Sequence, residues 1–246
     1  MPKMFIEQVL DIDKLTFKKT DDLKKPKYGK IKIFHDGWEN IDIGRPPTGN
    51  QVVKEIKKIQ EEVKGATAEQ KEQYLNCDED ASYYIKQYMD DHDLDYREET
   101  MEYIENQCVP IIRHYKNFYN RPRPYQVADK LGMKFERYKT GTAKTPAYPS
   151  GHTVQPILVA EFYAKLYPQH RAGIMKGAKI CGYGRVIAGL HYPSDYDAGV
   201  VLGRGLLDYL DMGQLKEDAP MNSTGPGIAM PPTMKKKKKK KDIFKR

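Results

Sequence analysis

The sequence predicts an all-α protein, because its strongest hydrophobic patterns repeat at helical spacing. Apolar residues recur three or four positions apart between residues 50 and 215, and Pro, Gly and hydroxyl residues mark where these patterns begin and end. At 246 residues the chain is long enough for one domain with a sizeable core. We therefore expect a helical bundle over residues 50–215, preceded by an irregular arm or cover over residues 1–49.

Eight segments carry helical spacing or helix-start signals. They lie at about residues 50–65, from Thr67 onward, and at 78–91, 96–119, 127–131, 150–166, 169–190 and 193–212. Pro110 should kink or split the helix that contains it, because proline removes a backbone donor and clashes with the preceding turn. The alternating stretch Lys30 to Phe34 could form a short strand. The loop at 134–148, rich in Thr, Lys, Gly and Pro, could border a pocket.

The net charge of the chain comes from its end. The formal net charge is +8 at pH 7, and the stretch from Lys235 onward alone carries nine Lys or Arg and one Asp. The remainder is balanced, with 33 basic and 33 acidic residues, and offers no broad electrostatic footprint for DNA or RNA. Residues 216–246, rich in Pro, Gly and Lys, cannot bury a core, and we expect a disordered tail. This tail could contact nucleic acid or an anionic membrane surface weakly, or have no specific role.

Three cysteines, Cys77, Cys108 and Cys181, are too few and too widely spaced for a disulfide framework or a zinc ribbon. We expect buried thiols, and their odd number suits a reducing compartment. The first residues lack the apolar core of a signal peptide, and no apolar run is long enough to span a bilayer. These observations predict a soluble, cytoplasmic protein without an integral membrane segment. Self-association into a homo-oligomer is left open.

Three polar clusters between Lys116 and Asp195 carry chemistry suited to a phosphate ester. They read KNFYNRPRP, YPSGH and GRVIAGLHYPSD, and each lies at an expected helix boundary. Arg123 and Arg185 each offer a guanidinium fork to an oxyanion, and Lys116 offers a point charge. The unpaired backbone N–H groups that follow Ser150 at a helix start add further donors. These groups together predict an oxyanion cradle.

Two histidines could divide the work of phosphate-ester hydrolysis. His191 and Asp195 are four residues apart across a helix start, so the carboxylate can hold one ring nitrogen and leave the other as the nucleophile. His152, at the other helix start, is then the general acid, and acts as base when water hydrolyses the phosphohistidine. A metal site formed by the same three residues is the competing interpretation, but the nearby cations would repel a divalent ion. We therefore expect no metal and no cofactor.

These clusters resemble the signature of the type 2 phosphatidic acid phosphatase and vanadium haloperoxidase superfamily, and in character the soluble bacterial class A acid phosphatases. The first part, Lys, six residues, Arg-Pro, runs here from Lys116 to Pro124, and the second, Pro-Ser-Gly-His, is Pro149 to His152. The third part, usually Ser-Arg, five residues, His, three residues, Asp, runs from Gly184 to Asp195. Glycine replaces the usual serine at its first position.

The resemblance implies an all-helical bundle core and a metal-free phosphohistidine mechanism, with His191 as the nucleophile. The implied phosphate ligands are Lys116, Arg123, Ser150, Gly151, His152 and Arg185. Gly184 lacks the usual hydroxyl donor; its backbone N–H could still donate, and we expect weaker phosphate binding rather than lost activity. Vanadate is expected to bind as a phosphate mimic.

The resulting hypothesis is a metal-independent, acid phosphatase-like phosphomonoesterase that acts on a soluble, small-molecule phosphoester. Two alternatives stay open. One is a vanadium-dependent haloperoxidase, which would use the same cradle but typically has a much longer chain. The other is a non-catalytic module that binds phosphate or nucleic acid, although such a module needs neither a nucleophile nor an acid. The natural substrate is not readable, because the loop at 134–148 and the first 100 residues carry no motif.

Overall fold

The computed structural model describes residues 11–17 and 31–218, and the regular elements in these ranges are helices. In chain order they are η2 (Trp38–Asn40), α2 (Asn50–Gly65), α3 (Ala68–Glu79), α4 (Tyr83–Asp91), α5 (Glu98–Tyr119), α6 (Pro124–Lys130), α7 (Gly151–Leu166), η3 (Pro168–His170), α8 (Arg171–Ile187), α9 (Pro193–Gly205), η4 (Leu206–Tyr209) and α10 (Met212–Asp218). The all-α prediction is confirmed. The predicted tail at 216–246 lies outside the described residues, except for the end of α10.

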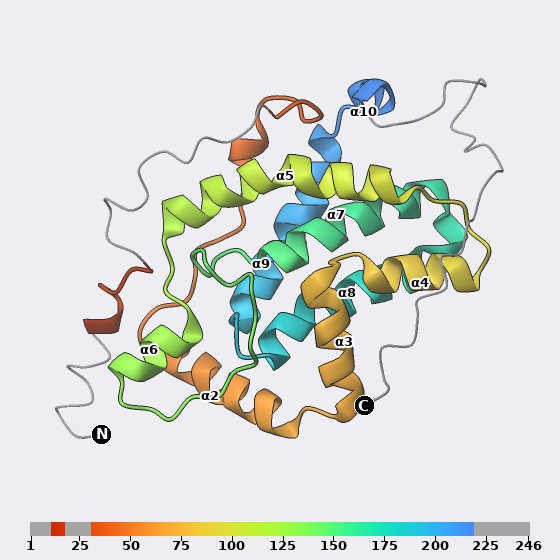
Figure 1. Ribbon diagram of the computed structural model, residues 1–246. Helices are drawn as coiled ribbons and strands as arrows, with labels where there is room; N and C mark the ends of the chain where they lie inside the picture. The colour runs from red at the N-terminus through yellow and green to blue at the C-terminus, as the bar shows by residue number, and fades with distance from the viewer. Residues whose placement is uncertain (1–10, 18–30, 219–246) are drawn as a thin grey trace.

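Helix α7 forms the centre of the fold and packs against α5, α8 and α9. It is apolar on nearly all sides, and Val154, Ile157, Leu158 and Tyr163 are among its buried residues. A helix that is apolar all round needs neighbours on every side. Helices α2, α3 and α4 pack in turn against α8. Figure 1 shows α5 and α7 crossing the upper half of the molecule, with α2 along its base.

The described part of the N-terminal arm lies against this bundle. Trp38 and Ile43 are buried in the main core. The Tyr115 hydroxyl of α5 donates to the Trp38 carbonyl oxygen at 2.9 Å, and the Tyr148 hydroxyl donates to the Ile43 carbonyl oxygen at 2.6 Å. The arm therefore acts as a cover whose backbone is bound by tyrosines of the helical part.

The predicted strand at Lys30 to Phe34 is wrong for the residues that the structure describes. Phe34 forms only an isolated antiparallel bridge with Leu210, and the Asp211 backbone N–H donates to the Ile33 carbonyl oxygen at 2.8 Å. The partner segment is the short extended passage between η4 and α10, which is too short for a ladder. The last predicted helix, 193–212, is also shorter than expected: α9 ends at Gly205, tightens into η4, and the chain is extended at Leu210.

Two other helix predictions need correction. The segment 78–91 is not one helix, because Asp78 belongs to α3 and α4 begins only at Tyr83. The Asp80 carboxylate accepts from the Ser82 backbone N–H at 3.0 Å, which stabilises the turn between them. Pro110 does not split its helix, because α5 runs without a break from Glu98 to Tyr119. Its buried face, packed against α7, offsets the missing backbone hydrogen bond.

Glycine brings α9 unusually close to the start of α7. A Cβ atom at Gly199 would lie 2.7 Å from Thr153 Cβ and 3.0 Å from the Ser150 carbonyl oxygen. Glycine therefore permits this approach, which any side chain would obstruct. Asp195, one turn earlier on α9, lies beside Ser150, whose backbone N–H donates to the Asp195 carbonyl oxygen at 3.0 Å. Two of the three predicted clusters meet at this contact.

The prediction of three buried thiols is wrong for two of them. Cys77 of α3 and Cys181 of α8 form a disulfide with a Cα–Cα distance of 5.2 Å, and Cys108 is a buried free thiol. The two bonded residues are 104 positions apart, and the sequence gives no local sign of such a pairing. The cytoplasmic location stays a prediction, without the support that the thiols were expected to give.

Reducing this disulfide is expected to lower the free energy of unfolding by about 2–4 kcal/mol, because the bridge closes a long loop in the unfolded chain. Urea denaturation with and without a reductant measures the change. The double variant Cys77→Ser, Cys181→Ser is the control, since its unfolding midpoint should not respond to the reductant. Equal midpoints of the wild type under both conditions would show that the bridge contributes no stability.

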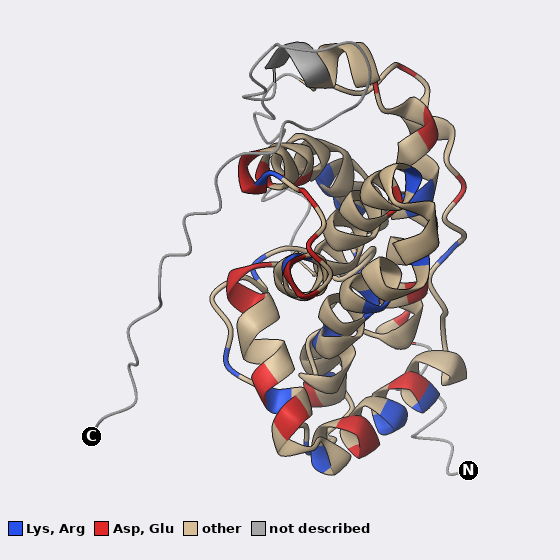
Figure 2. Ribbon diagram, turned by 90° about the vertical axis from the view of Figure 1, so that its right-hand side faces the viewer, with Lys and Arg blue, Asp and Glu red and all other residues tan. Residues whose placement is uncertain are grey.

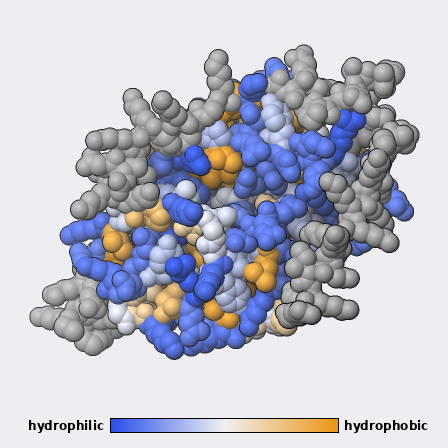
Figure 3. Space-filling model, in the orientation of Figure 1, coloured by the Kyte–Doolittle hydropathy of each residue, from blue (hydrophilic) through white to orange (hydrophobic). Residues whose placement is uncertain are grey.

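The surface of the described residues mixes charges of both signs. Figure 2 shows basic and acidic residues interspersed along the helices of the face it presents, as expected from the charge balance outside the tail. Figure 3 shows small, separate apolar areas on a mostly hydrophilic surface. Among the described helices, none combines the length and apolar character that a membrane span requires.

Candidate active site

The three predicted clusters converge at the start of α7. Lys116 lies in the last turn of α5, Arg123 directly precedes α6, and Arg185 lies near the end of α8. All three side chains are buried. Their charges act on both His152 and His191, because each of the three cations lowers the pKa of each histidine. The structure therefore brings the predicted cations and histidines into one electrostatic environment.

His191 is held between a carboxylate and a guanidinium. Its Nδ1 lies 3.0 Å from Asp195 Oδ2, which also accepts from the Tyr192 backbone N–H at 2.9 Å. Its Nε2 lies 2.8 Å from Arg123 Nη1. Since an arginine can only donate, Nε2 is the acceptor, and the ring proton is assigned to Nδ1. Burial and then the charge of Arg123 hold the pKa of His191 well below its ordinary value, so the ring is neutral with a lone pair on Nε2.

A second arginine, Arg121, binds the other carboxylate oxygen of Asp195. It was not predicted as a site residue. Its Nη1 donates to Asp195 Oδ1 at 2.6 Å and to Ser194 Oγ at 2.8 Å, and its Nη2 donates to Glu55 Oε2 at 2.9 Å. The guanidinium also lies 3.8 Å from the ring centroid of Tyr192. The sequence signal was the repeated Arg-Pro pair, of which only the second arginine fits the family spacing.

The loop at 134–148 surrounds two of the cations with carbonyl oxygens. Lys116 Nζ donates to the carbonyl oxygens of Pro146 and Ala147, and Arg123 Nε donates to that of Thr145 at 2.9 Å. Burial, and then the charge of Arg123, hold the pKa of Lys116 well below its ordinary value. Burial lowers the pKa of Arg123 to about 10. The loop thus borders the site, as predicted, and supplies neutral acceptors but no charge to these two cations.

Arg185 has an acidic partner that the sequence did not indicate. Its Nη1 forms an ion pair with Asp78 Oδ1, and its Nη2 donates to Thr142 Oγ1 at 2.9 Å and to Thr140 Oγ1 at 3.4 Å. Its Nε–H is buried and makes no hydrogen bond within the described part of the chain. One donor of this predicted phosphate ligand is therefore unsatisfied, which is costly unless an acceptor binds there.

The start of α7 supplies Ser150, Gly151 and His152. Ser150 occupies the N-cap position as predicted, but its side chain does not cap the helix; instead its Oγ accepts from Thr153 Oγ1 at 2.9 Å. Ser150 is buried, whereas Gly151 and His152 are partly exposed. Burial, followed by the charge of Arg185, lowers the pKa of His152 to about 3. His152 is therefore neutral in the free protein and lies on the more accessible side of the site.

Gly184 lies inside α8, beside Tyr74 of α3. A Cβ atom there would meet only the Tyr74 Cα at 3.8 Å, so the structure has room for a small side chain. A residue inside an α-helix donates its N–H to the carbonyl four residues earlier. The expectation that the Gly184 N–H could replace the missing hydroxyl is therefore not supported. Within the described ranges, no group of three or more His, Cys, Asp or Glu residues is arranged to hold a metal ion.

Residues 105–209 match the family model described as the PAP2 superfamily. All three polar clusters lie inside the matched residues, and the resemblance seen in the sequence is confirmed. Asp78 and Glu55, which bind two of the site arginines, lie outside them.

Relatives named as phosphatases align with about a third of the chain. An acid phosphatase of Zymomonas mobilis subsp. mobilis is 38% identical over 90 residues, which are 37% of this chain and 34% of the relative. A non-specific acid phosphatase of Salmonella typhimurium is 33% identical over 88 residues, 36% and 35% of the two chains. A lipid A 1-phosphatase of Rhizobium etli is 33% identical over 88 residues, 36% and 38% of the two chains. The chain spans about a third of the length of these relatives.

A crystal structure of a transmembrane PAP2-type phosphatidylglycerolphosphate phosphatase from Bacillus subtilis aligns with 70% of this chain and 79% of its own, with a TM-score of 0.33 and 18% identity. A TM-score this low supports no conclusion about function.

Proposed function

We propose that the protein is a phosphomonoesterase that works through a phosphohistidine on His191, without a metal ion. The observation that carries this proposal is the burial of Lys116, Arg123 and Arg185 around two neutral histidines. Buried cations whose charges depress their neighbours' pKa values call for an anion. The PAP2 match and the relatives named acid phosphatase favour a phosphate monoester as that anion.

The contacts suggest how the ester is held. The Arg185 Nε–H and the backbone N–H groups at the start of α7 are donors for phosphoryl oxygens. Arg123 Nη1 donates to His191 Nε2 in the free protein. A bound phosphoryl oxygen would take over this donor and free the Nε2 lone pair. Substrate binding and activation of the nucleophile are thereby one event.

The reaction then proceeds in two steps. His191 Nε2 attacks phosphorus, the bond between phosphorus and the ester oxygen breaks, and His152 gives its proton to the leaving oxygen. Asp195 holds the proton on Nδ1 and stabilises the positive charge of the phosphorylated ring. In the second step neutral His152 takes a proton from water, the water oxygen bonds to phosphorus, and the bond to Nε2 breaks. Phosphate leaves and both histidines return to their starting state.

His152 must gain a proton before it can act as the acid, and the negative charge of a bound dianion favours this protonation. In the free protein its pKa is about 3, after burial and the charge of Arg185; a dianion beside it favours the protonated ring and raises the pKa. Phosphate or vanadate binding near neutral pH is therefore expected to take up about one proton, with affinity falling as pH rises through the bound-state pKa.

Calorimetry of vanadate or phosphate binding in two buffers of different ionisation enthalpy measures this uptake. The variant His152→Asn is the matched control and should take up fewer protons than the wild type. Equal uptake by both proteins would assign the proton to another group, such as Lys116, whose pKa is also lowered.

The function is tested with phosphomonoesters in the presence of EDTA, comparing the wild type with His191→Ala. A panel of an aryl phosphate, a nucleotide, a sugar phosphate and a micellar lipid phosphate covers the substrate classes, including that suggested by the relative named lipid A 1-phosphatase. We propose that soluble esters are hydrolysed and that EDTA has no effect. Activity abolished by EDTA would overturn the metal-free mechanism.

A further inference from the structure

Asp78 adds a carboxylate, besides Asp195, to the cluster of cations around the two histidines. It lies near the end of α3 and forms an ion pair with Arg185. Its carboxylate also accepts from Thr140 Oγ1 at 2.9 Å and from Thr142 Oγ1 at 3.1 Å. Each of these groups is a donor that an anionic ligand could otherwise use. Asp78 therefore acts as a built-in anion at the edge of the proposed phosphate site.

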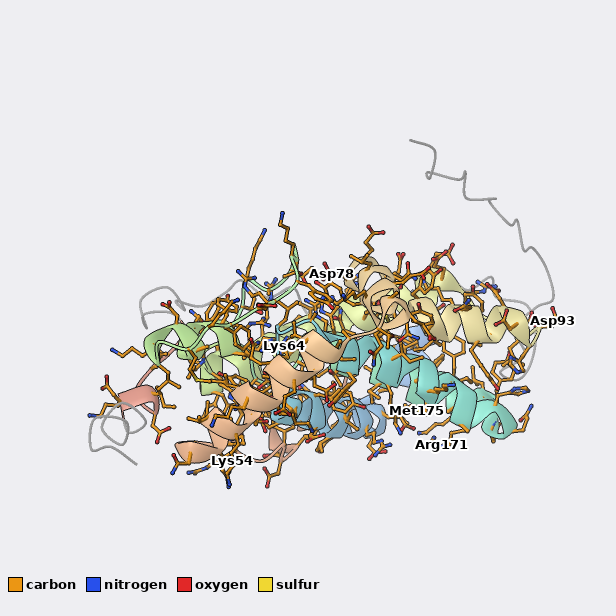
Figure 4. The ribbon with its side chains drawn as sticks, turned by 90° about the horizontal axis from the view of Figure 1, so that it is seen from below. Lys54, Lys64, Asp78, Asp93, Arg171 and Met175 are labelled. Atoms are coloured by element: carbon orange, nitrogen blue, oxygen red, sulfur yellow. A yellow bond between two sulfur atoms is a disulfide. The ribbon has the colours of Figure 1, made fainter. Side chains whose placement is uncertain are left out.

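Asp78 is more exposed to solvent than Arg185. Its side chain is 17% exposed, whereas that of Arg185 is 1% exposed. Figure 4 shows Asp78 between α3 and the loop that joins α6 to α7. Although burial raises its pKa, the hydrogen bond and charge of Arg185 hold that pKa below the ordinary value. The carboxylate is therefore ionised at neutral pH, and it is the more exposed partner of the ion pair with Arg185.

A disulfide joins the two helices that carry this ion pair. Cys77 directly precedes Asp78, and its partner Cys181 lies four residues before Arg185 on α8. Residues four apart share one face of a helix. The covalent link between α3 and α8 thus joins the two segments that carry the ion pair, and it limits how far Asp78 can move when a ligand binds.

The charge of Asp78 acts on His152, the proposed acid, and is not among the main charges that act on His191. Its charge favours protonated His152, while the main charges acting on His191 are Arg123, Lys116 and Arg185. In the proposed reaction His152 protonates the leaving oxygen. An ester oxygen that receives this proton must lie beside His152, where the charge of Asp78 also acts.

We propose that Asp78 is a specificity-determining residue that disfavours phosphomonoesters whose leaving group carries a negative charge of its own. This inference rests on the proposed function. An anionic leaving group would meet the Asp78 carboxylate beside Arg185 and be repelled. A neutral leaving group meets no such repulsion, and its hydroxyl groups can donate to the carboxylate.

The test compares two esters of similar size, glycerol phosphate and phosphoglycerate. The first has a neutral hydroxymethyl group where the second has a carboxylate. The wild type is expected to prefer glycerol phosphate in kcat/KM. In Asp78→Asn, which keeps the shape and can still accept from the threonines, the preference should fall about tenfold, as expected when one charge beside a partly shielded site is removed. Glu79→Gln is the matched control, since Glu79 is the exposed neighbouring acid, and its preference should equal that of the wild type.

The ratio of the two kcat/KM values shows whether Asp78 determines specificity or only positions Arg185. If Asp78 only positions Arg185, both esters slow by the same factor and the ratio stays unchanged, which would overturn the proposal. Asp78→Ser, a second neutral variant, should lower the ratio as well, and circular dichroism checks that each variant is folded. If the wild type hydrolyses neither ester nor any other in the panel, the proposed function fails and the specificity proposal fails with it.

Discussion

Replacing His191 by alanine is expected to abolish phosphomonoester hydrolysis, with kcat lowered by about 10⁴-fold or more. The imidazole is the group whose Nε2, once a bound ester has taken over the Arg123 donor, would bond to phosphorus, and no other described histidine is held by Asp195. The carboxylate keeps Arg121 and the Tyr192 backbone N–H after the substitution. The variant should therefore fold, and initial rates with EDTA present measure the loss.

The matched control is His170→Ala, because His170 lies in η3 on a partly exposed position and contacts Tyr88. Its rates should equal those of the wild type. Rapid quenching of the wild type with excess substrate should also trap a phosphoenzyme that is labile in acid and stable in base, the behaviour of a phosphorylated histidine. If His191→Ala retains activity above about one hundredth of the wild type, another group is the nucleophile.

The parts of the site that could be predicted are those defined by short spacings. His191 and Asp195 are four residues apart at a helix start, and the geometry of one turn brings them together. Ser150 was recognisable as a helix start in the same way. The helices with a clear apolar face were also predictable, since packing follows that face.

The parts that could not be predicted depend on contacts between distant segments. Asp78 is 107 residues from Arg185, and Glu55 is 139 residues from Ser194. Nothing in a local pattern distinguishes these acids from solvated neighbours on α3 and α2. Pro110 shows the opposite error, in which a strong local signal was outweighed by the packing of the whole helix against α7.

Replacing Arg121 by leucine is expected to lower the free energy of unfolding by about 3–5 kcal/mol, the largest effect on stability that we predict. Arg121 is the cation shared by Asp195 and Glu55, whose side chains are 0% and 15% exposed. Removing it leaves both acids without their shared cation, and water cannot reach the fully buried Asp195 to replace it. Urea denaturation measures the change. Arg113→Leu is the matched control, since Arg113 is exposed on α5, and should stay within about 0.5 kcal/mol of the wild type.

Arg121→Lys separates charge from geometry. Lysine keeps the charge but lacks the planar fork with which Arg121 reaches Asp195 and Glu55 together. Its stability should therefore lie between those of the wild type and the leucine variant. Glu55 belongs to α2, outside the matched PAP2 residues. The Arg121 guanidinium therefore also links Asp195, the partner of His191, to a helix that the family match does not cover. Wild-type stability in Arg121→Leu would show that Asp195 and Glu55 need no shared cation, and that α2 supports the site in some other way.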